Sequence, residues 1–239
     1  MGEIEVSALK PSGHDSAAGR PAEGSSRRRF LKLAGGAGAA TASATLVAAC
    51  GSGAEPMTEV GAEQRQPVPG GDAGIVKYAL TLEFFEEDFY EQVLDSGQIS
   101  DGELLSLTEL VYDNEKKHVE TLSQLVEELA VTPPQRPKTD FDSVIDAGER
   151  KILETSAIFE NLGAAAYLGQ GANIQDPDIL VAALEIHSVE ARHAARFNEL
   201  AGFGFLTGDD LRGSVPNGAF AKPMTMDQVL ERVQPFVKT

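Results

Sequence analysis

Two copies of one short motif, a glutamate followed three residues later by a histidine, lie 75 residues apart in this chain. They are Glu115-x-x-His118 and Glu190-x-x-His193. On an α-helix, residues three apart stand on one face, so each copy directs a carboxylate and an imidazole at a single point. The whole chain has only 4 histidines, and the two motifs use half of them. Two such points that face each other can hold two metal ions.

A further glutamate precedes each motif by the length of a helix and a turn. Glu83 lies 32 residues before Glu115, and Glu160 lies 30 residues before Glu190. A carboxylate-bridged metal pair in a four-helix bundle uses one Glu from each of two helices and one Glu-x-x-His from each of the other two. The chain contains this complete set, which predicts a site for two metal ions.

A tyrosine follows each of these lone glutamates after seven residues, Tyr90 after Glu83 and Tyr167 after Glu160. The equal spacing favours a role as hydrogen-bond donors to ligand carboxylates, although both rings would also suit an ordinary core. The chain thus repeats one hairpin pattern, E-x6-Y and then E-x-x-H, and such a repeat predicts a site on a pseudo-twofold axis.

Three neighbouring residues offer alternatives or additions to this set. Glu86 and Glu87 lie one turn beyond Glu83, and either can turn inward in its place. His187 stands three residues before Glu190 on almost the same helix face. We expect His187 beside the ligands or at the rim of the site, because six ligands already complete the usual set.

Apolar residues at helical spacing surround both Glu-x-x-His motifs. The two stripes comprise Leu104, Leu107, Val111, Leu122, Leu125 and Leu129 around the first motif, and Ile179, Ala183, Ile186, Phe197 and Leu200 around the second. Only the motif interrupts each stripe, whereas solvated motifs would lie on polar faces. A buried carboxylate is costly unless it is paired, so the interruptions require a partner such as a cation.

Start and stop signals predict four long helices and one short one, and no strand pattern of any length is present. The expected helices run from Asp72 to about Leu94, from a capping box at Ser100-x-x-Glu103, from about Ser143 to Gln170, from Asp176-Pro177, and from Thr225-x-x-Gln228 to about Val233. Three prolines within residues 131–143 suit a long crossover. The predicted fold is all-α, a four-helix bundle of two hairpins joined by that crossover, with a short C-terminal helix.

The chain resembles the ferritin-like superfamily, and most closely its exported bacterial ferritin-like domain proteins. The resemblance covers about residues 72–204 and rests on the segments YALTLEFFEEDFY, DNEKKHVETL, AIFENLGAAAYLG and SVEARHAARF. It implies six ligands, with Glu115 and Glu190 favoured as bridges: Glu83, Glu115, His118, Glu160, Glu190 and His193. Carboxylates with imidazoles suit iron or manganese, of which we favour iron. The single cysteine leaves no C-x-x-C pair, so the chain departs from rubrerythrins.

The first fifty residues have the pattern of an export signal. Residues 26–32, SRRRFLK, match the twin-arginine motif, and a weakly apolar stretch follows. The segment LVAAC resembles a lipoprotein cleavage box with Cys50 as the lipidated residue, although a buried cysteine after an ordinary signal is the alternative. We therefore expect a signal over 1–49, a flexible tether over 50–71, the bundle over 72–204, and a C-terminal loop and short helix over 205–239. The protein would lie at the outer face of the cytoplasmic membrane or in the periplasm, anchored by lipid.

The chain is strongly acidic, with 20 Lys and Arg against 37 Asp and Glu. Its net charge of -17 repels nucleic acid and attracts cations. We expect a membrane-tethered protein whose two metal ions react with oxygen or peroxide, as an oxidase, peroxidase or catalase does. The alternatives are a metal-binding or buffering module at the cell envelope, and a metal-free structural bundle.

Overall fold

The computed structural model describes residues 68–205 and 211–238, which fold into helices. The helices are α2 (Gly71–Ser96), α3 (Gly102–Glu128), α4 (Asp142–Ile145), α5 (Glu149–Gly171), α6 (Pro177–Leu200), α7 (Met226–Val233) and the 3-10 helix η1 (Gln234–Phe236). The described residues form no strand, only one isolated antiparallel bridge between Thr139 and Val237. Among them, no helix is long and apolar enough to span a bilayer. The prediction of an all-α fold is confirmed.

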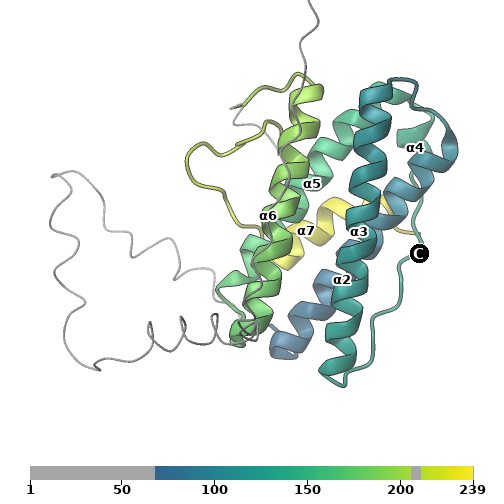
Figure 1. The fold of residues 1–239 in the computed structure, drawn as a ribbon. Helices are drawn as coiled ribbons and strands as arrows, with labels where there is room; N and C mark the ends of the chain where they lie inside the picture. The colour runs from purple at the N-terminus through teal and green to yellow at the C-terminus, as the bar shows by residue number, and fades with distance from the viewer. Residues whose placement is uncertain (1–67, 206–210, 239) are drawn as a thin grey trace, which may run out of the picture. The chain divides into compact units, whose positions relative to one another are not determined.

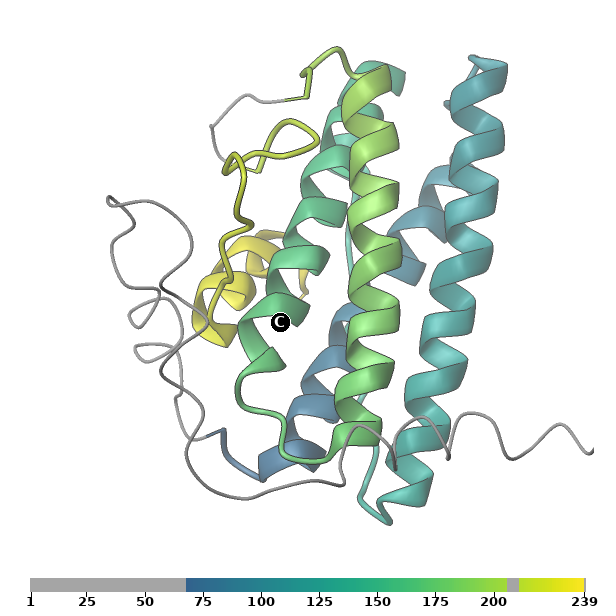
Figure 2. The same ribbon diagram turned by 60° about the vertical axis from the view of Figure 1, so that its left-hand side comes forward.

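The four long helices pack as two hairpins. Helix α2 packs along α3, and α5 packs along α6. Smaller contacts between α2 and α5 and between α3 and α6 join the hairpins into a four-helix bundle, which Figure 1 shows with every helix labelled. The chain crosses from one hairpin to the other between α3 and α5, as predicted. In Figure 2, α7 lies against α5 on the side away from α3.

The start of α3 differs from the prediction. Asp101, rather than Ser100, caps the helix, and its side chain accepts hydrogen bonds from the backbone N–H groups of Glu103 and Leu104 at 3.0 and 2.9 Å. Ser100 is engaged elsewhere, because its hydroxyl donates to Glu149 at the start of α5. The residue predicted as the cap therefore ties the two hairpins together instead.

Asp72, the expected start of the first helix, lies in the first turn of α2 and does not cap it. Helix α2 begins after Gly70, whose φ of 86° is the left-handed conformation that glycine adopts easily. The Asp72 carboxylate accepts the backbone N–H groups of Gln175 and Asp176, just before α6. Asp176 in turn caps α6, with Pro177 in its first turn, as the sequence predicts.

The predicted helix from Ser143 to Gln170 is interrupted. Helix α4 ends at Ile145, and α5 begins only at Glu149. Gly148 lies between them with a φ of 88°, outside the helical region, so the chain turns before the long helix begins. The C-terminal prediction is confirmed, since Thr225 and Gln228 form the capping box that opens α7.

An aromatic cluster holds the crossover and the C-terminal segment against the bundle. Its ring centroids lie 5.0 to 6.2 Å apart, mostly edge to face. The members are Phe85 and Phe89 of α2, Phe141 of the crossover, Phe159 of α5 and Phe236 of η1. This layer fixes α2 against α5, the two helices that carry the lone glutamates.

Candidate metal centre

Each long helix places at least one glutamate in the interior of the bundle. These are Glu83 of α2, Glu115 of α3, Glu160 of α5 and Glu190 of α6, and all four are fully buried. The glutamates that interrupt the apolar stripes therefore face the interior of the bundle, as predicted. These four carboxylates lie where an ordinary core would hold aliphatic side chains.

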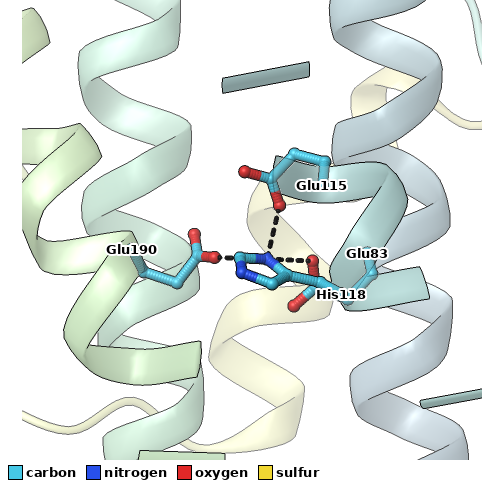
Figure 3. A group of neighbouring side chains, drawn as sticks. All are labelled: Glu83, Glu115, His118 and Glu190. Atoms are coloured by element: carbon cyan, nitrogen blue, oxygen red, sulfur yellow. Dashed lines mark hydrogen bonds and ion pairs between the residues drawn. The ribbon is translucent and has the colours of Figure 1, made fainter. Parts of the chain in front are cut away.

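The first group of ligands surrounds His118. Its Nδ1 atom lies 2.9 Å from Glu115 Oε2, 3.1 Å from Glu190 Oε1 and 3.3 Å from Glu83 Oε2. Figure 3 shows the imidazole between the carboxylates of Glu190 and Glu83, with Glu115 above it. One potential ligand atom from each of the four residues lies within 4.8 Å of the others, so one ion can contact them all.

The second group surrounds His193 and overlaps the first. The Nδ1 atom of His193 lies 3.0 Å from Glu160 Oε2 and 3.2 Å from Glu115 Oε1. Glu115, Glu160, Glu190 and His193 again have ligand atoms within 4.8 Å of one another. Glu115 and Glu190 belong to both groups, which is the arrangement that two carboxylate-bridged ions need.

The two tyrosines hydrogen-bond to glutamates of the opposite hairpin. Tyr90 donates to Glu160 Oε1, and Tyr167 donates to Glu83 Oε1. Burial and the neighbouring carboxylate raise the pKa of both hydroxyls well above the usual range. Both therefore keep their protons and act as donors, so the interpretation as supports of ligand carboxylates fits better than that of ordinary core rings.

The carboxylate oxygens at this point are short of hydrogen-bond donors. Among the described residues, Glu190 Oε2 has no hydrogen-bond partner, and Glu115 Oε1 and Glu190 Oε1 face only the Nδ1 atoms of His193 and His118, at 3.2 and 3.1 Å, which other carboxylates share. A buried carboxylate without a partner is costly, and a bound cation removes the cost. The donors are hard oxygens and imidazole nitrogens, which fit iron or manganese.

The comparison with known families agrees with the geometry. Residues 71–202 match the family described as ferritin-like domain, which is more than half of the chain. The chain belongs to the ferritin-like domain family. No curated protein matches the sequence.

Protons compensate the buried charges of this ferritin-like domain when no cation is present. Burial raises the pKa of Glu115 to about 7, although hydrogen bonds with His118 and His193 oppose the rise. Burial disfavours the charged form of His193, yet Glu160 and Glu115 together raise its pKa to about 10. The carboxylates likewise raise the pKa of His118. Metal ions that bind here must displace protons from these groups.

The structure shows which of the three neighbouring glutamates of α2, Glu83, Glu86 and Glu87, turn inward. Glu83 is in the first group, while Glu87 points outward and pairs with Arg136 of the crossover. Glu86 also turns inward and is only 4% exposed, so α2 contributes two buried carboxylates rather than one. The spacing of three residues between Glu83 and Glu86, the same as in Glu-x-x-His, is the pattern that indicates this.

Two other polar residues lie near the ligands. His187 is half-buried, and its Nδ1 lies 2.9 Å from the backbone oxygen of Ala164, which links α6 to α5. Its predicted place beside the ligands stays a prediction. The sequence pattern did not single out Asn114, whose side-chain amide lies 2.9 Å from Nε2 of His193. This contact fixes the imidazole so that Nδ1 faces the carboxylates.

Proposed function

We propose that this ferritin-like protein binds two iron or manganese ions and reacts with oxygen or hydrogen peroxide. The observation that carries the proposal is the pair of overlapping four-residue groups that share Glu115 and Glu190. A single isolated group would indicate a single ion, and exposed acidic residues would indicate none. Of the two metals, we favour iron.

Each residue has a defined task in this proposal. Glu83 with His118, and Glu160 with His193, would hold one ion each, while Glu115 and Glu190 would be shared between the two ions. Two adjacent divalent ions that can each give up one electron supply a two-electron reduction of a small oxidant. The protein keeps the carboxylates in place through the two tyrosine hydrogen bonds. Burial of all four glutamates keeps bulk water away from the site.

The test is a single-turnover reaction. Protein loaded anaerobically with ferrous iron is mixed with oxygen or with hydrogen peroxide, and the ferrous content and the oxidant are followed over time. We expect the ferrous content and the oxidant concentration to fall within one turnover. Later turnovers should be slow, because the chain has one cysteine and no C-x-x-C pair for an electron-carrying iron centre. Protein that retains two ferrous ions in air would instead support a metal-binding module.

That module is the second candidate function. The acidic chain attracts cations, and no built-in electron carrier of the rubredoxin kind is encoded. A buffering role at the cell envelope would use the same residues but would require rapid release of the ions. Exchange of bound manganese with free manganese within seconds would favour buffering over oxidant chemistry.

The proposed location rests on the N-terminal sequence. The twin-arginine motif at 26–32 and the LVAAC box that ends at Cys50 lie outside the described residues. Both support export in the folded state and attachment to the membrane through lipid at Cys50. Export of a folded protein suits one that acquires its metal before it leaves the cytoplasm.

A further inference from the structure

The two halves of the metal centre differ at one position. Glu83 corresponds to Glu160 in the internal repeat, because each precedes its tyrosine by seven residues. Three residues further along, α2 has Glu86, whereas α5 has Gly163. The repeat therefore carries an additional buried carboxylate in one half and no side chain in the other.

Gly163 leaves room for two carboxylates. A Cβ atom at this position would lie 2.9 Å from Glu86 Oε1 and 2.9 Å from Glu190 Oε2, closer than carbon and oxygen approach without a shift. The two oxygens thus converge on one point beside α5. Glycine is unfavourable in a helix interior relative to alanine, and the close approach of Glu86 and Glu190 explains why it is present.

Glu86 has no protein partner that accounts for its burial. Its Oε2 atom makes no hydrogen bond, and the side chain is 4% exposed. Burial raises its pKa well above the usual range, and the negative charge of Glu190 adds to this effect. Glu190 is one of the residues shared by both candidate ligand groups, and the Glu86 carboxylate converges with it beside Gly163, so Glu86 lies beside the proposed bridge.

We propose that Glu86 is a seventh protein ligand of the metal centre, which binds one of the two ions and makes the two positions unequal. This inference rests on the proposed two-metal function. It follows from the burial of Glu86, from its unpartnered oxygen, and from the space that Gly163 leaves beside Glu190. The ion that Glu86 contacts has one more carboxylate than the other and binds more tightly.

The test is a titration of metal-free protein with Mn²⁺. Binding is measured by calorimetry and by the electron paramagnetic resonance signal of free Mn²⁺. Wild-type protein should bind two ions in two distinguishable steps. Glu86→Gln keeps the size of the side chain, and should weaken one step by about tenfold or more while the other changes little. Glu91→Gln, an exposed position on the same helix, is the matched control and should leave both steps unchanged.

A second variant approaches the same point from α5. Gly163→Ala crowds the carboxylates of Glu86 and Glu190, and should weaken the same step as Glu86→Gln. Thermal unfolding of the metal-free variants establishes that each is folded before the titration. If wild-type protein binds two ions and Glu86→Gln binds them equally tightly, the seventh ligand is refuted while the metal centre stands. If wild-type protein binds no metal, both proposals are overturned.

Discussion

Tyr90 of α2 donates a hydrogen bond to Glu160 of α5, a residue 70 positions later in the chain. Tyr167 of α5 makes the equivalent bond to Glu83 of α2. Each hairpin therefore supports a proposed ligand that belongs to the other hairpin. The crossed pair has the pseudo-twofold relation that the internal repeat predicts, and it couples the assembly of the bundle to the geometry of the site.

The first prediction concerns these crossed hydrogen bonds. Tyr90→Phe and Tyr167→Phe should each weaken metal affinity by about ten- to a hundredfold, because a support of a ligand carboxylate is lost while the ring remains. The pseudo-twofold relation predicts similar losses for both variants. Titration with Mn²⁺ measures the effect. Wild-type affinity in both variants would show that the tyrosines serve only as core residues.

The second prediction concerns the shared carboxylates. Glu115→Ala and Glu190→Ala should each abolish binding of two ions, because either substitution removes a ligand from both groups. Metal content per chain after loading and desalting measures this directly. Glu91→Ala is the control, since Glu91 is exposed on α2. Glu86 is unsuitable as a control, because it is buried beside the site.

The third prediction concerns pH. In metal-free protein the pKa of Glu115 is about 7, that of His193 about 10, and those of His118 and Glu190 are also raised. These groups hold protons near neutral pH that a metal ion must displace, so binding releases protons and affinity falls as the pH is lowered. Each proton released corresponds to about a tenfold change in affinity per pH unit. Mn²⁺ titrations between about pH 6 and pH 8 in buffers of different protonation enthalpy measure the number of protons released on binding. An affinity independent of pH would contradict the assignment of these groups to the metal site.

The sequence predicted which six polar residues lie together in the interior better than it predicted their surroundings. Glu-x-x-His places both side chains on one helix face whatever the tertiary structure, so Glu115, His118, Glu190 and His193 follow from local geometry. The crossed tyrosine bonds depend on how the hairpins face each other, which a single helix does not encode. The sequence offers Glu86 only as an alternative to Glu83. In the structure both are buried, because the face of α2 that turns inward is wider than a single stripe of residues.

The fold was predicted in outline, and its errors lie at helix ends. Ser100 and Asp72 are ordinary capping residues by type, yet both bond instead to the other hairpin, Ser100 to Glu149 at the start of α5 and Asp72 to backbone N–H groups just before α6. Such long-range bonds compete with local caps, and a local sequence pattern cannot predict them. Asp176 and Thr225 have no such competitor among the bonds of the described residues, and there the local pattern is sufficient.

The fourth prediction concerns the N-terminal segment. The mature protein should fractionate with membranes and carry lipid on Cys50, whereas Cys50→Ser should remain unprocessed or be released. Two acyl chains are enough for stable anchoring. Mass spectrometry of the mature N-terminus checks both the cleavage site and the modification. An unmodified Cys50 in a soluble mature chain would show that the lipoprotein interpretation is wrong.

The last prediction is metal content under native conditions. Elemental analysis of protein purified without chelators, after expression with its own signal, tests the two-metal centre most directly. The overlapping groups around Glu115 and Glu190 predict close to two ions of iron or manganese per chain. Protein that contains no metal, or a single zinc ion per chain, would contradict the account.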